Sequence, residues 1–216
     1  MEDQDKATKV RLKAEFGEGN VIFATVKRFG LMAFRKPTEE QYLDYSGSIG
    51  APMESSMVAC EQFAFDCMAH PVEAEAKAKA RRLFKAMPLL ASNTASAICA
   101  MSCGDYDPLE LTDDEKKALD ERWEFGWGGL KPAGLAPIVM ATDQTAGTIA
   151  RIAFDAQQNG DTDNGRKIRA AVLALTRSPD NTTMEGIISQ RPALLRPLWY
   201  RAQELVGAGV AEVGKD

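Results

Sequence analysis

The segment PVEAEAKAKARRLFKAMP (71–88), followed by LLASNTASAICAMSCG (89–104), is the part of the chain around which we expect the fold to be organised. Pro71 and Pro88 suit the first turn of a helix, where a missing N–H leaves no intrahelical hydrogen bond unmade. Gly104 suits the left-handed residue that ends a helix. The sequence therefore predicts a helical hairpin, with one helix on each side of Pro88.

The two helices of this hairpin differ in charge. Residues 74–82 are rich in Ala, Glu, Lys and Arg, which favour a helix with a solvent-exposed face. Residues 89–103 carry no charged side chain, so this helix has to be covered, either by the rest of the chain or by a partner. The candidate partner-binding residues are its apolar positions, Leu89, Leu90, Ile98 and Met101.

Three short apolar segments precede the hairpin and predict strands. KVRLKAEF (9–16) alternates apolar and polar residues, and VIFATV (21–26) and LMAFRKP (31–37) follow after glycine-containing turns. A capping box at 38–41 and helical spacing over 53–68 predict two helices next. The predicted class is α+β, with a short N-terminal antiparallel β-meander followed by a mostly helical body.

A glycine- and proline-rich segment, FGWGGLKPAGLAP (125–137), predicts a domain junction or a long ordered loop in the second half. Before it, the capping box Thr112-Asp113-Asp114-Glu115 opens an acidic helix that runs through Trp123. We therefore expect three parts: a β-meander and helical hairpin domain (1–107), an acidic helix with a linker (108–137), and a second, mainly helical domain (138–216).

Within the last part, IVMAT (138–142) predicts a strand, whereas TIARIAF (148–154) is compatible with either a strand or a helix. Residues 166–177 predict a helix, and a final helix is expected from Arg191-Pro192 through Val206. The tail, 207–216, is expected to be loose.

The two halves of the chain have a similar order of helix-like segments and prolines. CEQFAFDCMAHP (60–71) aligns with IRAAVLALTRSP (168–179), and residues 84–104 align with 188–208. Identity is low, so a diverged internal duplication competes with chance similarity between helix–proline–helix units.

The charge balance excludes some classes of partner. The net charge is −5 and the pI is near 5.1, which disfavours nucleic acid and anionic membranes as partners. No run approaches eighteen apolar residues, and the N-terminus lacks the apolar segment of a secretory signal. The four cysteines are most simply reduced thiols, which indicates a cytoplasmic location.

One set of side chains has the composition of a metal site. Cys67 and His70 are three residues apart and Cys99 and Cys103 are four apart, so each pair would share a helix face. We favour the interpretation that the cysteines are small buried thiols. Zinc bound by three cysteines and a histidine is the alternative. Because His70 is the sole histidine and no nucleophile motif accompanies it, we expect neither an enzyme nor a cofactor.

Aromatic residues cluster beside the predicted linker, at Trp123, Phe125 and Trp127. One interpretation is a wedge in the core between domains. The other is a contact surface, because tryptophan and phenylalanine are enriched where partners bind. We therefore add Trp123 and Trp127 to the candidate partner-binding residues.

The order of elements in residues 9–104 resembles that of phage tail assembly chaperones. The resemblance is carried by FRKPTEEQYLDY (34–45), CMAHP (67–71) and LFKAMPLLASNTASAICAMSCG (83–104), and covers about half of the chain. It implies a non-enzymatic helical protein that binds the tape-measure protein and keeps its hydrophobic helix soluble during tail assembly.

The expected function is therefore protein binding of this chaperone-like kind, in the host cytoplasm if the chain is encoded by a phage. Self-association into a homo-oligomer is compatible with the same uncharged helix. The alternatives are a structural component of a virion or other assembly, a zinc-stabilised module, and an inhibitor of a host protein.

Overall fold

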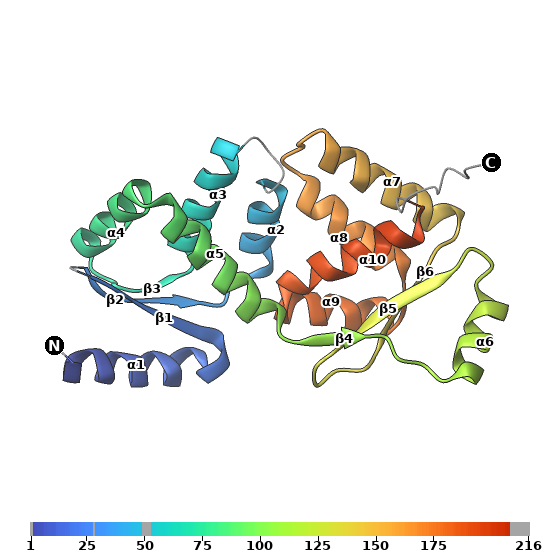
Figure 1. Cartoon of the computed structure of the whole chain (residues 1–216), viewed down its shortest axis with the longest axis horizontal. Coiled ribbons are helices and arrows are strands. Elements are labelled where there is room, and N and C mark those ends of the chain that lie inside the picture. The colour runs from blue at the N-terminus through green and yellow to red at the C-terminus, as the bar shows by residue number, and fades with distance from the viewer. Residues whose placement is uncertain (1, 28, 49–52, 208–216) are drawn as a thin grey trace, which may run out of the picture. The chain divides into compact units, whose positions relative to one another are not determined.

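A computed structural model describes residues 2–27, 29–48 and 53–207 of the chain (Figure 1). The chain divides into two compact units, Met1–Cys103 and Gly104–Asp216, which we call unit 1 and unit 2. Each unit combines antiparallel strands with helices, which confirms the predicted α+β class.

The described part of unit 1 begins with a helix and continues with two strands, two helices, a third strand and two more helices. In chain order these elements are α1 (Glu2–Phe16), the 3-10 helix η1 (Glu18–Asn20), β1 (Val21–Val26), β2 (Gly30–Arg35), α2 (Glu39–Ser48), α3 (Met53–Asp66), β3 (Met68–His70), α4 (Ala74–Ala86) and α5 (Pro88–Cys103).

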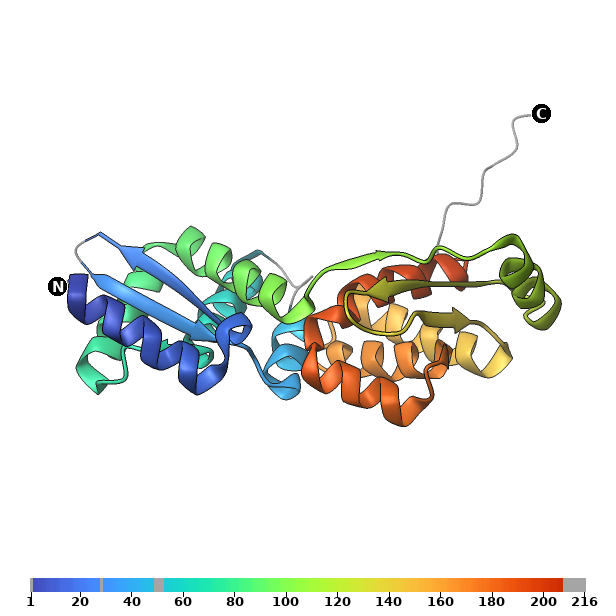
Figure 2. The ribbon, with the colours of Figure 1, turned by 90° about the horizontal axis from the view of Figure 1, so that it is seen from below.

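The sheet of unit 1 has the order β1-β2-β3, and all of its pairs are antiparallel. One face packs against α1, where Leu12 and Ala33 are buried and Phe23 lies against them (Figure 2). Because side chains alternate along a strand, Phe34 points to the other face, where its ring lies 6.2 Å from that of Phe84 on α4. The sheet is therefore covered on both faces.

The helices of unit 1 form a second layer of core. α3 packs against α5, and Phe63, Ala64 and Ile98 from these helices are buried. The rings of Tyr45 on α2 and Phe63 are stacked with their centroids 4.1 Å apart.

The described part of unit 2 repeats much of this order and adds a strand at the start. Its elements are β4 (Tyr106–Pro108), α6 (Asp113–Arg122), β5 (Trp127–Pro132), β6 (Ile138–Ala141), α7 (Gln144–Gln158), α8 (Asn164–Leu175), β7 (Thr176–Ser178), α9 (Asn181–Gln190), the 3-10 helix η2 (Pro192–Leu194) and α10 (Leu195–Leu205).

The sheet of unit 2 has the order β4-β5-β6-β7 and is also antiparallel throughout. Leu130 and Ile138 are a buried cross-strand pair, and α10 packs against β5. Helices α7, α8 and α10 contact one another, which buries Ala150, Val172 and Leu198.

Both units contain the order strand, strand, helix, helix, strand, helix, helix. The third strand of this repeated order, β3 in unit 1 and β7 in unit 2, is followed by a cis peptide bond to proline, at His70–Pro71 and Ser178–Pro179. In each unit this strand pairs with the second one through a shifted register, between Ala33 and Phe34 and between Val139 and Met140. The repeated topology supports the interpretation that the sequence contains a diverged internal duplication.

The prediction of a strand over 9–16 is wrong, because these residues belong to helix α1. Lysine, arginine, alanine and glutamate all favour a helix, and Arg11 and Glu15 form an i,i+4 ion pair at 3.2 Å. Of the apolar residues in the segment, Leu12 is 1% exposed while Val10 is 64% exposed. The third strand of the N-terminal sheet is instead β3.

Of the predicted acidic helix and linker over 108–137, the linker at 125–137 is also wrong. The acidic helix is present, and its capping box is formed by Thr112 and Glu115. The glycine-rich residues after it, however, are strand β5, paired with β4 and β6. The boundary between the units lies instead at Gly104, where φ is +67°.

Several other predicted elements are confirmed. Strands are present at β1, β2 and β6, and the ambiguous segment 148–154 is helical, within α7. The predicted loose tail lies outside the described residues, apart from Gly207. No single helix in the described ranges is long and apolar enough to cross a membrane; α4 and α5 meet that length and composition only as a pair, which is bent by 107°.

The first prediction concerns a buried and an exposed apolar side chain of α5. Replacing Ile98, which is fully buried, with alanine should lower the free energy of unfolding by about 2–5 kcal/mol through lost burial and a cavity. The matched change Leu89→Ala, at a side chain that is 74% exposed, should alter it by no more than about 0.5 kcal/mol. Urea unfolding followed by circular dichroism measures both, and equal losses would contradict this packing.

The second prediction concerns the closest approach of β5 and β6. A Cβ atom at Gly129 would lie 2.0 Å from the carbonyl oxygen of Ile138, and a backbone atom cannot rotate away. Gly129→Ala should therefore lower the free energy of unfolding by about 2 kcal/mol or more. Gly128→Ala is the control, because its Cβ would meet only the side chain of Leu205, at 3.6 Å. Tryptophan fluorescence in urea should separate the two variants.

Candidate functional site

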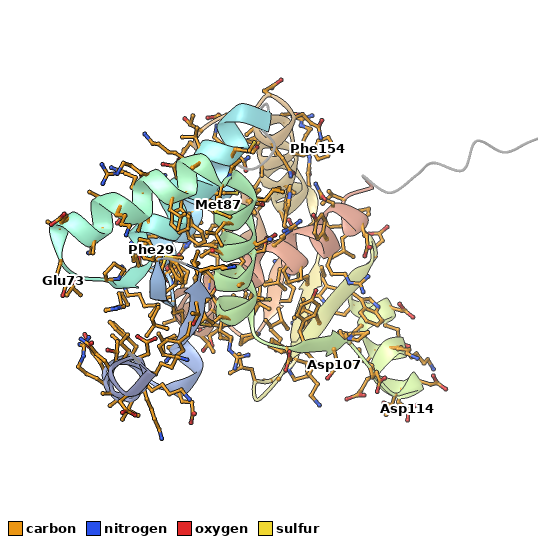
Figure 3. All side chains as sticks on the ribbon, turned by 60° about the vertical axis from the view of Figure 1, so that its left-hand side comes forward. Phe29, Glu73, Met87, Asp107, Asp114 and Phe154 are labelled. Carbon is orange, nitrogen blue, oxygen red and sulfur yellow. The ribbon has the colours of Figure 1, made fainter. Side chains whose placement is uncertain are left out.

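The structure does not gather the four apolar candidates of α5 on one exposed surface. Leu89 is 74% exposed, Leu90 and Met101 are half-buried, and Ile98 is fully buried in unit 1. Leu89 instead adjoins Met87, which is 47% exposed and stands at the bend between α4 and α5 (Figure 3). The uncharged helix is therefore covered mainly by its own unit, and among its large apolar side chains in the described structure only Leu89, in the first turn, is mostly exposed.

The two tryptophans that were partner-binding candidates make contacts within unit 2. The indole Nε1 of Trp127 donates a hydrogen bond to Asp120 Oδ1 at 2.8 Å. The ring of Trp123 lies near two guanidinium groups, at 5.2 Å from that of Arg122 and 5.1 Å from that of Arg177. Since no residue of α6 is buried, these contacts hold the helix to its unit.

Arg177 extends this contact to the start of α7. Its guanidinium donates a hydrogen bond to Asp143 Oδ2 at 2.7 Å and another to the carbonyl oxygen of Ala174 at 2.5 Å. The other carboxylate oxygen of Asp143 accepts the backbone N–H of Ala146 at 2.8 Å, which caps the helix. The residues after α6 are therefore fixed next to the first turn of α7.

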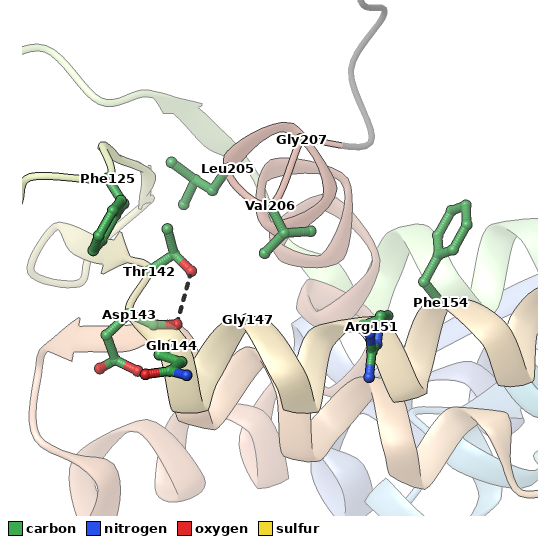
Figure 4. Close-up of a pocket in the computed structure, with 10 residues that line it drawn as sticks. All are labelled: Phe125, Thr142, Asp143, Gln144, Gly147, Arg151, Phe154, Leu205, Val206 and Gly207. Carbon is green, nitrogen blue, oxygen red and sulfur yellow. Dashed lines mark hydrogen bonds between the residues drawn. The ribbon is translucent and has the colours of Figure 1, made fainter.

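A groove of about 900 Å³ lies at this place in unit 2 (Figure 4). Its walls come from α7, from the C-terminal end of α10 and from the connection between α6 and β5. The lining residues are Phe125, Thr142, Asp143, Gln144, Gly147, Arg151, Phe154, Leu205, Val206 and Gly207. Phe125 is 64% exposed, so a large ring is presented to solvent where other apolar side chains are close by.

The chemistry of the groove suits binding more than acid–base catalysis. Its carboxylate, Asp143, is engaged by Arg177 and by the start of α7. The hydroxyl of Thr142 donates to the carbonyl oxygen of Asp143 at 3.4 Å. The remaining walls are largely apolar, as expected of a surface that takes up a hydrophobic group.

A second hollow, of about 620 Å³, lies between α2 and α3 in unit 1. Its polar lining belongs to a network that supports the fold: the side chain of Gln41 accepts from Arg35 at 3.2 Å and donates to the carbonyl oxygen of Asp66 at 3.3 Å. The groove of unit 2 is therefore the stronger candidate for a binding site.

The cysteines and His70 do not form the zinc site that was considered as an alternative. In the described ranges no three His, Cys, Asp or Glu side chains are grouped so that they could hold a metal ion. Cys67 is fully buried, and burial raises the pKa of its thiol to about 12. His70 lies on β3 with a buried Nδ1 that has no hydrogen-bond partner within the part of the chain that the structure describes.

Tyr45 lies near two of the cysteines, Cys60 and Cys99. Its hydroxyl is 3.7 Å from the Sγ atom of Cys60. Burial, and then the nearby Cys99 and Cys60, raise the pKa of the phenol well above its usual range. Tyr45 and Cys67 are therefore uncharged core groups at neutral pH, unsuited to nucleophilic chemistry.

Sequence reasoning missed most of the groove. Phe125 was noticed as part of an aromatic cluster, but Arg151 and Phe154 are in the segment whose secondary structure was ambiguous. Leu205 and Val206, at the end of the last helix, gave no signal of their own. No protein-family model, no curated protein and no solved structure matches the chain.

The third prediction concerns pH. The pKa of the Cys67 thiol is about 12 in the folded protein, above its ordinary value of 9.0. The free energy of unfolding that depends on this proton is therefore fully present below pH 9 and is lost as the pH rises toward 12. The urea midpoint should fall more steeply between pH 8 and pH 10.5 for the wild type than for Cys67→Ala. Identical pH slopes in the two proteins would contradict this assignment.

Proposed function

We propose that the chain is a non-enzymatic protein-binding protein of the tail assembly chaperone kind, and that the groove of unit 2 shields an apolar helix of its partner. The observation that carries the proposal is the groove itself, with an exposed Phe125 at one end, Phe154 at the other, and Leu205 and Val206 in its lining (Figure 4). The resemblance over residues 9–104 suggests a tape-measure protein as the partner and the host cytoplasm as the place of action.

Physical chemistry supports a binding role for such a groove. An apolar helix that enters it would remove the Phe125 ring from water, and burial of a phenylalanine side chain stabilises a complex by about 1.5–3 kcal/mol. Aromatic residues of this kind are frequent centres of binding energy. Contacts within unit 2 hold the walls in place, so little ordering is needed before a partner binds.

The fourth prediction tests the groove with two matched substitutions. Phe125→Asp should weaken capture of a co-expressed tape-measure protein by about tenfold or more, because the lost burial and the new charge both oppose binding. Val10→Asp is the control, since Val10 is equally exposed at 64% but lies on α1 of unit 1. Co-purification and the soluble fraction of the tape-measure protein measure the effect.

The same experiment separates the alternatives. Equal capture by both variants would exclude the groove as the binding surface. A loss seen with Leu89→Asp, and not with Phe125→Asp, would move the surface to the bend before α5. Retention of the chain at fixed stoichiometry in purified particles, measured by mass spectrometry, would favour a structural component over a chaperone.

A further inference from the structure

The lining of the unit 2 groove includes a cation, Arg151, that has no partner among the described residues. Arg151, on the exposed side of α7, lines the groove but makes no hydrogen bond or ion pair with the residues that the structure describes. The other charged lining residue, Asp143, already accepts hydrogen bonds from Arg177 and from the N–H of Ala146. Among the described residues, no group neutralises the charge of Arg151 directly, which leaves it to pair with a ligand.

The position of Arg151 along α7 defines what a ligand would meet. Gln144 and Arg151 are seven residues apart, which is about two helical turns or roughly 10 Å. Phe154 follows within one more turn, so polar, cationic and aromatic side chains succeed one another along the same wall (Figure 4). Gly147 lies between Gln144 and Arg151 and has no side chain to fill the groove. A Cβ atom at Gly147 would have Thr142 Oγ1 as its nearest neighbour, at 3.5 Å.

An occupant that satisfies the whole wall has to be amphipathic. It needs apolar groups for Phe125, Phe154, Leu205 and Val206, and an anionic group for Arg151. Residues 144–154 of α7 span roughly 15 Å, which matches about three turns of a second helix. Opposite charges beside an apolar surface also select the register of a bound helix, because a misplaced charge loses its partner.

We propose that the groove binds an amphipathic helix of a partner protein, with an apolar stripe about three turns long and a glutamate or aspartate that pairs with Arg151. This inference rests on the proposed function and specifies the chemistry of the bound segment. The carboxylate sets orientation and specificity, while the apolar stripe supplies most of the affinity.

The fifth prediction uses a pair of synthetic helical peptides and the full-length chain. The two peptides, each of fifteen residues, share a leucine and alanine stripe and differ only in a central glutamate or glutamine at its edge. Fluorescence anisotropy should show that the wild type binds the glutamate peptide about fivefold more tightly, because a partly exposed ion pair contributes about 1 kcal/mol. Arg151→Gln should bind both peptides equally.

Charge reversal sharpens the test. Arg151→Glu should prefer a third peptide that carries lysine at the same position. Arg82→Glu is the control: it changes the net charge by the same amount, but Arg82 is an exposed residue of α4 in unit 1, and its preference should remain that of the wild type. Coupling between the two positions shows direct pairing.

Three outcomes would overturn the inference. The first is equal binding of the glutamate and glutamine peptides by the wild type. The second is the same shift in Arg82→Glu as in Arg151→Glu, which would show a long-range effect of net charge. The third is self-association of the chain alone, detected by sedimentation and lost in Phe125→Asp, which would assign the groove to a second copy. None of the peptide results decides whether the chain captures a tape-measure protein, so failure here is distinguishable from failure of the proposed function.

Discussion

The guanidinium of Arg177 connects the parts of unit 2 on which the groove depends. Arg177 belongs to strand β7, which directly follows α8. Its side chain contacts the carboxylate of Asp143 and the ring of Trp123. Asp143 in turn starts α7, and Trp123 ends α6. The side chain of Arg177 is 18% exposed and that of Asp143 is 51% exposed, so the ion pair is only partly shielded from solvent. Together with the contact on Trp123 it links the end of α6 to the start of α7.

The sequence predicted those elements whose signal is local. The capping box at Thr112 and the proline that begins α5, Pro88, identify helix starts without reference to distant contacts. Pro71 does not begin a helix: it follows β3 through a cis peptide bond, and α4 begins at Ala74. The strand predicted over 9–16 failed because alternation in a short, charged segment also fits a helix that buries only Leu12. The linker predicted around Gly129 failed because glycine is typical of loops, whereas here it permits close contact between two strands.

The candidate site was harder to predict, because its residues meet across the chain. Trp123 was interpreted either as part of a core wedge or as a partner-binding residue, but its partner Arg177 lies more than fifty positions later and has no recognisable motif. Ile98 was expected to be available for binding because its helix is uncharged, yet unit 1 alone buries it completely. The groove combines residues from three separate segments, and only Phe125 among them had attracted attention. Periodicity indicates that a face will be covered, but not by what.

All three tryptophans of the chain, Trp123, Trp127 and Trp199, belong to unit 2. Trp123 lies between two arginines, Trp127 donates to Asp120, and Trp199 donates to Gln157 at 2.8 Å. Indole emission, excited at wavelengths where tyrosine does not absorb, therefore reports on unit 2 alone. Comparison of that emission with circular dichroism would show directly whether the two units unfold as one cooperative body or as two.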